Sequence, residues 1–247
     1  MTREELITAI GGQGMALAKP IAELKSTYET DFIARRAIQG LLAVSLGFIL
    51  LSVSLDFMRY FGKDIDPNWT FSINRERSVP EFYGYAESLT TAILLLICHI
   101  RLGTRAFLFW ALFFAFVLAD DSLSYHERFG RWLVETANLP TLPGLRPIDT
   151  GEIVAWCIAA IVLVAPLLWS LVARTREEIS VHLVFGTVFS MLVFFAVVVD
   201  MAHEAVTGPL NRVVNWIEDG GEMLCLAAGV SCALLFYRSA RRGSGEA

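Results

Sequence analysis

The chain has 247 residues, is 55% hydrophobic and carries a formal net charge of −5 at pH 7. Its mean hydropathy of +0.55 lies well above that of a typical soluble domain and indicates a membrane protein. The acidic balance argues against nucleic-acid binding, and the four cysteines lack the spacing of a zinc ribbon or a disulfide framework.

The order of the elements predicts an all-α, polytopic membrane protein. Residues 1–36 show no apolar signal core and are predicted to form a cytoplasmic N-terminal arm. A transmembrane domain over 37–237 follows, and 238–247 form a basic cytoplasmic tail. A membrane-spanning helix needs about 20 apolar residues. Six runs meet this need and are predicted to form three hairpins: 37–57, 83–100, 104–121, 153–173, 180–200 and 219–237.

Charge decides the predicted orientation. Residues before the first span, the short connections 101–105 and 174–178, and the tail lie on one side of the membrane. That side holds twelve of the 20 Lys and Arg residues but only eight of the 25 Asp and Glu residues, which gives +4 against −9 on the other side. The positive-inside rule therefore predicts an inner (plasma) membrane protein with both termini cytoplasmic.

Acidic residues gather where the six spans meet the opposite face. Charged groups in or near a membrane core are costly, so such a layer suggests a functional site. Asp121, Asp200 and Glu204 are expected at helix C-termini, where the helix dipole opposes each carboxylate by about 0.3–1 kcal/mol. A cation is needed to offset this cost: an arginine, a protonated histidine or a metal ion.

The histidine spacing favours a metal ion. In the segment Asp200-Met-Ala-His203-Glu204, the acid and the histidine share a helix face. A carboxylate and a histidine three residues apart form half of the site in di-iron and di-manganese bundles. If the third helix continues past Asp121, His126 lies at the same level as His203. The predicted ligands are Asp121, Asp200, His203 and Glu222, with His126 and Glu87 as further ligands or outer neighbours.

This ligand set predicts a metal-dependent hydrolase or oxidase that acts on a lipid or small amphiphile from the outer leaflet. Mixed carboxylate and imidazole ligands suit Zn, Mn or Fe. A metal-activated water is expected as the nucleophile, with Glu127 or Glu204 as the base. Haem is not expected, because His99 and His182 are single histidines near helix ends.

Two other functions fit the same pattern. A proton- or cation-coupled transporter would also use buried acids, but the middle of the spans is poor in polar residues. A non-catalytic protein could instead pair the acids with loop arginines in a structural polar cap. The candidates for that pairing are Arg128, Arg131, Arg146 and Arg212.

One short element resembles a known family. Ser122-Leu-Ser-Tyr-His126, a Ser-x-x-x-His element, is similar to one in the alkaline ceramidase and adiponectin-receptor hydrolases. Those are seven-span zinc hydrolases of lipid amides, so the resemblance implies that a carboxylate–histidine site in a membrane can serve lipid hydrolysis. It covers five residues. The chain has six predicted spans, whereas that family has seven, and it lacks the family's late His-x-x-x-His pair. The motif alone therefore does not assign the chain to that family.

Overall fold

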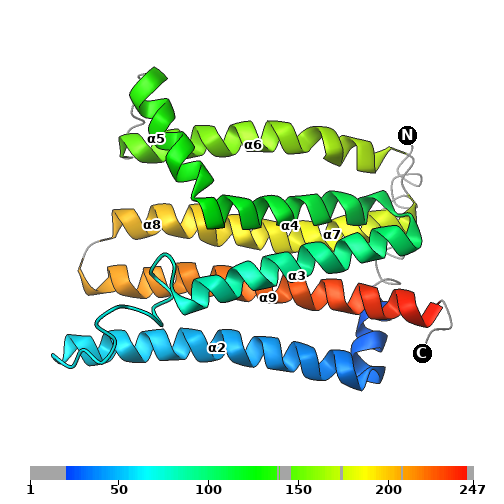
Figure 1. Cartoon of the computed structure of the whole chain (residues 1–247), viewed down its shortest axis with the longest axis horizontal. Helices are drawn as coiled ribbons and strands as arrows, with labels where there is room; N and C mark the ends of the chain where they lie inside the picture. Colours follow the sequence, from blue (N-terminus) through cyan, green and yellow to red (C-terminus); the bar gives the residue numbers. More distant parts are fainter. Residues whose placement is uncertain (1–20, 138, 140–145, 173–174, 207, 244–247) are drawn as a thin grey trace, which may run out of the picture.

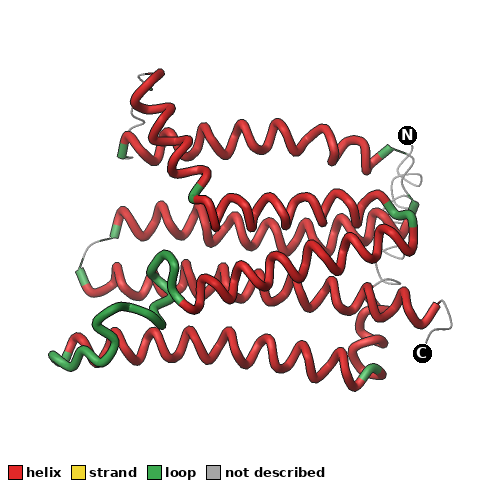
Figure 2. Tube along the Cα trace, viewed as in Figure 1, coloured by secondary structure: helices red, strands yellow, loops and turns green. Residues whose placement is uncertain are grey.

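A computed structural model of the chain describes residues 21–137, 139, 146–172, 175–206 and 208–243. The first twenty residues of the predicted N-terminal arm lie outside this range. The described residues form helices and loops without strands, which confirms the predicted all-α class (Figure 2). Residues 21–30 are helical, and the elements after them are α2 (Phe32–Tyr60), α3 (Val79–Leu102), α4 (Arg105–Leu123), α5 (Tyr125–Ala137), α6 (Pro147–Leu171), α7 (Arg176–Val193), the π-helical segment η1 (Phe194–Val199), α8 (Asp200–Ala205) and α9 (Pro209–Gly243).

Six helical stretches are long and apolar enough to cross a membrane, as the hydropathy pattern predicted. Four are α2, α3, α4 and α6. The fifth, Glu178–Ala202, runs through α7, η1 and part of α8, and the sixth, Leu210–Arg242, lies within α9. The chain is therefore a polytopic membrane protein.

Local capping signals explain where several helices begin and end. The Asp31 side chain accepts a hydrogen bond from the Ala34 amide at 3.0 Å and starts α2. Ser78 caps α3 in the same way, and Gly103 ends that helix in the left-handed conformation, with φ 69°. Thr175 and Glu178 form a capping box at the start of α7.

Helix α9 organises the bundle. It packs against α2, α3, α7, η1 and α8, while α4 packs against α3, α6 and α7. The helices run roughly along one axis, with α6 at one edge and α2 at the other (Figure 1). The side chains of Phe114, Phe185 and Leu95 are fully buried between α3, α4, α7 and α9. An aromatic core therefore fills the middle of the bundle.

Arginines near the end of α9 contact the residue that precedes α2. We call this end of the bundle, where α2 begins and α9 finishes, the basic end. There, Arg238 Nε lies 2.6 Å from Asp31 Oδ2, and Arg242 Nη2 lies 3.4 Å from the same oxygen. The hydrogen bond from Arg238 holds the pKa of Asp31 below its usual value. These contacts place the beginning of α2 and the end of α9 at the same end of the molecule.

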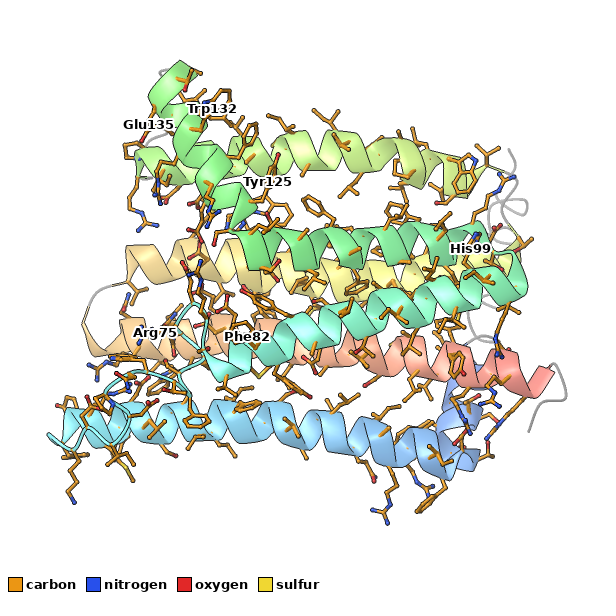
Figure 3. The ribbon with its side chains drawn as sticks, in the orientation of Figure 1. Arg75, Phe82, His99, Tyr125, Trp132 and Glu135 are labelled. Carbon is orange, nitrogen blue, oxygen red and sulfur yellow. The ribbon has the colours of Figure 1, made fainter. Side chains whose placement is uncertain are left out.

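The opposite end, here called the acidic end, holds the 61–78 loop, α5, the end of α8 and the beginning of α9. In Figure 3, Arg75, Phe82 and Tyr125 lie toward this end, and His99 lies at the basic end.

The expectation that the third span continues past Asp121 to His126 is wrong. Helix α4 ends at Leu123, and Ser124 takes a left-handed conformation with φ 48° and ψ 47°. The chain turns there and α5 leaves at an angle, to pack on the beginning of α6 (Figure 1). His126 is thus the second residue of α5, a separate helix, because the left-handed residue breaks the α4 hydrogen-bond ladder.

Candidate functional site

Carboxylates from three helical elements meet at the acidic end. We call Asp121 of α4, Asp200 of α8, and Asp219 and Glu222 of α9 the acidic cluster. The Glu222 carboxylate lies within electrostatic range of the other three. Asp219 and Glu222 share a face of α9 because they are three residues apart. Asp121 and Asp200, from the third and fifth spans, thus lie within electrostatic range of Glu222, from the sixth span, at this end. That their side chains share one ligand site stays a prediction.

Several members of this cluster lack a basic partner. Among the residues that the structure describes, no Lys or Arg forms an ion pair with Asp121, Asp219 or Glu222; the ion pairs at this end belong to other carboxylates. The Asn215 amide donates a hydrogen bond of 3.1 Å to Asp219 Oδ2, which supplies a dipole but no charge. Like-charged carboxylates at short range are unfavourable unless a cation or protons join them.

The described part of the chain contains no group of three or more His, Cys, Asp or Glu side chains arranged to hold a metal ion. The side chains of His203 and Glu204, predicted as a ligand and as a base, lie outside the described residues. Their place relative to the acidic cluster stays a prediction.

His126 joins the site through Asp120, one residue before the predicted ligand Asp121. The Asp120 side chain is 1% exposed. Its Oδ1 accepts the His126 backbone N–H at 3.0 Å, and its Oδ2 accepts a 2.9 Å hydrogen bond from His126 Nδ1. Asp120 thus caps the first turn of α5, where the helix dipole favours a negative charge. For Asp120, this favourable interaction offsets the unfavourable effect of the α4 dipole on a carboxylate at the end of that helix.

The surroundings of His126 favour its charged form. Burial alone would lower the pKa of His126, but the hydrogen bond to Asp120 and the charges of Asp120, Glu152 and Glu127 hold it above its usual value. The ring of Trp156 on α6 lies 5.7 Å from the imidazole, centroid to centroid. Glu152 is within electrostatic range of both His126 and Asp200, so it bridges this pair and the acidic cluster.

Glu87 lies apart from the acidic cluster. Its side chain, on α3, is buried at 2% exposure, with Tyr83 and Ser45 of α2 as polar neighbours. The Tyr83 and Ser45 hydroxyls both donate to the Leu41 carbonyl, at 3.2 and 3.0 Å. Neither Glu87 oxygen accepts a hydrogen bond of normal geometry from the described residues. Glu87 is therefore a buried acid, separate from the acidic cluster, where α3 faces α2.

Other acids at this end have arginine partners. Arg59 Nη1 lies 2.9 Å from Asp56 Oδ1, and the same guanidinium lies 3.2 Å from Asp64. Arg59 also stacks 3.7 Å above the Trp69 ring. On α6, Arg146 Nη2 lies 2.8 Å from Asp149 Oδ1. A salt-bridged cap therefore exists, built mainly by an arginine that the sequence-based prediction did not consider.

Two residues at this end were left out of the predicted site, although each had a signal in the sequence. Asp219 stands three residues before Glu222, and Arg59 stands three residues after Asp56, so each pair shares a helix face.

Comparison with known proteins gives a family without an assigned activity. Residues 41–237 match the family described as "Domain of unknown function (DUF8692)". The chain belongs to this family. The match covers all six spans except the ends of α2 and α9, so the family is defined by the membrane bundle itself. No curated protein and no solved structure matches the chain.

Proposed function

We propose that this protein binds a divalent metal ion at its acidic end and uses it to act on a lipid or small amphiphile. The observation that carries the proposal is the convergence of Asp121, Asp219 and Glu222, without a Lys or Arg ion pair in the described structure. The side chains of His203 and Glu204, which lie outside the described residues, would complete the ligand set in this proposal. Mixed carboxylate and imidazole ligands suit Zn, Mn or Fe.

The position of the acidic cluster supports an amphiphilic substrate. Asp121 and Asp200 lie near the ends of membrane-spanning helices, and such ends are where lipid headgroups meet acyl chains. His126 and Glu127 begin α5 beside it, and Glu127 stays the candidate base in this proposal. The aromatic core below closes the middle of the bundle, which favours a one-sided site over a passage.

Elemental analysis of detergent-purified protein tests the metal. Wild type loaded with Zn, Mn or Fe and then dialysed should retain metal in a fixed ratio to protein. Glu222→Gln and Asp121→Asn should lose it. Glu135→Gln is the matched control, because Glu135 is an exposed carboxylate at the same end (Figure 3). Wild type without bound metal, or equal retention by all variants, would overturn the proposal.

Orientation is part of this proposal, with the acidic end outside an inner (plasma) membrane. In a variant lacking the four native cysteines, Glu135→Cys should react with an impermeant thiol reagent in intact cells, and Gly103→Cys should not. The opposite labelling would place the acidic end in the cytoplasm.

Glu87 favours a second candidate function, proton- or cation-coupled transport. A buried carboxyl without a basic partner is expected to be neutral, because burying its charge is costly. An exchangeable proton at Glu87 could then be coupled to movement of α2 against α3. Glu87→Gln should abolish pH-driven flux in proteoliposomes under this function and should leave metal retention unchanged.

A further inference from the structure

A pocket of about 370 Å³ opens at the acidic end between α2 and α9. It is separate from the acidic cluster, and the predicted function makes no use of it. Its walls come from one face of each helix and from the residue before α9: Asp56, Phe57, Tyr60, Gly208, Arg212 and Trp216.

The acid in this pocket already has its partners. Asp56 Oδ1 accepts a 2.9 Å hydrogen bond from Arg59, and its Oδ2 accepts a 2.9 Å hydrogen bond from Trp216 Nε1. The second bond ties α2 to α9 at the base of the pocket. Since both oxygens and the charge of Asp56 are satisfied, this residue builds the pocket and is not its ligand-binding group.

Arg212 is the polar group that remains available. It is exposed, it stands one turn before Trp216 on the same face of α9, and the described residues give it neither a hydrogen bond nor an ion pair. A guanidinium offers five N–H donors in a planar fork that fits phosphate. The pocket also includes Gly208 at the amino-terminal end of α9, a 35-residue helix whose dipole favours an anion there.

The other walls are aromatic and face outward. Phe57 is 60% exposed and Tyr60 is 70% exposed, both on the last two turns of a membrane-spanning helix. Tyr and Trp side chains are enriched where a protein meets the interface between acyl chains and headgroups. The pocket therefore combines an unpaired cation with apolar walls at the depth of the lipid headgroups.

We propose that this pocket binds a phospholipid of the surrounding bilayer, with its phosphate on Arg212 and its acyl chains against Phe57 and Tyr60. Free phosphate is a poor occupant, because one exposed charge pair contributes only about 0–1 kcal/mol in water. A phospholipid adds apolar contacts and is present in the membrane at high local concentration. The bound lipid would fasten α2 to α9 at the acidic end.

Native mass spectrometry of the delipidated, full-length protein tests this inference. Wild type should bind one phosphatidylglycerol or phosphatidylethanolamine more tightly than further copies. Arg212→Gln should weaken that first event by up to about fivefold, since the exposed charge pair with the phosphate is lost. Arg131→Gln is the matched control, an exposed arginine at the same end outside the pocket, and it should bind like wild type.

Three results would overturn the inference. Equal binding by Arg212→Gln and wild type would remove the phosphate contact. Diacylglycerol binding as tightly as a phospholipid would show that the phosphate is not recognised. Inorganic phosphate competing at equal concentration would show that the lipid chains contribute nothing. Arg212 is exposed and unpaired in the described structure, so its replacement should leave folding and metal retention intact, which separates this test from that of the metal site.

Discussion

Replacing Gly151 with alanine is expected to push α5 away from α6 and loosen the contact between His126 and Asp120. Gly151 on α6 and Gly130 on α5 approach each other so closely that neither position has room for a side chain. A Cβ on Gly151 would overlap the Gly130 carbonyl, with 2.7 Å to its carbon, and would lie 2.9 Å from Val134 Cγ2.

The size of the effect follows from this geometry. Carbon atoms pack best at about 3.5–4.0 Å, so the two backbones must separate by about 1 Å. Overpacking of this kind costs about 1–3 kcal/mol. Alanine offsets about 0.5–1 kcal/mol of that by favouring the helix over glycine. A net loss of about 0–2.5 kcal/mol in the free energy of unfolding is expected relative to wild type, and the alanine control without the clash should gain rather than lose stability.

Thermal unfolding in detergent, followed by loss of the monodisperse peak in size-exclusion chromatography, measures the change. Gly47→Ala is the matched control, because Gly47 is also helical but a Cβ there would have nothing within 4 Å. Gly47→Ala should unfold at or slightly above the wild-type temperature, and Gly151→Ala should unfold below it. A Gly151→Ala protein as stable as the control would refute the close contact of α5 with α6.

Three other perturbations have expected outcomes in the same assay. Because the pKa of His126 is raised in the folded protein, protonation of His126 stabilises the fold. This stabilisation is complete at low pH and is lost as pH rises above about 6.5 and through the folded-state pKa. The difference in stability between wild type and His126→Gln should therefore close over that range. Asp31→Ala should destabilise the protein by about 1 kcal/mol more than Asp31→Asn. Both variants lose the ion pair with Arg238, but asparagine keeps the helix cap. Equal losses of stability would contradict the cap. Phe114→Ala should cost about 3–5 kcal/mol by leaving a cavity in the aromatic core, and a loss below about 1 kcal/mol would show that the core collapses around it.

The sequence predicted the spans well because the membrane imposes one strong rule. Every backbone polar group in lipid must be satisfied within the segment, so long apolar runs become helices. The ends were less well predicted. Helix α2 begins at Phe32, where Asp31 caps it, and not at residue 37 where the apolar run begins. Hydropathy measures the part of a helix that can be buried in lipid, whereas capping determines where the helix starts.

The candidate site was predicted in part, and its failures have a local cause. The placement of Asp121, Asp200 and Glu222 at the same end of the bundle follows from their common depth, which residue counting can give. The place of His126 depends on a left-handed residue at Ser124, and serine is not a strong signal for that conformation. The direction of Glu87 depends on how α3 is rotated against α2, which tertiary packing decides.

The acids of this protein divide into two groups by their partners, and this division carries the functional argument. Asp31, Asp56 and Asp120 each have a cation or imidazole within 3 Å, and each also stabilises helix ends or ties helices together. In each of these pairs, the attraction to the partner offsets the cost of placing a carboxylate there. Asp219 and Glu222 have no basic ion-pair partner in the described structure, yet they belong to α9, which packs against α2, α3, α7, η1 and α8. Without an arginine partner, ionised Asp219 and Glu222 would leave an unfavourable charge at the acidic end. A cation or bound protons must offset that charge. The acidic cluster therefore marks the place where ligand binding would stabilise the bundle as a whole, because any ligand held by α9 acts on α4 and α8 at once.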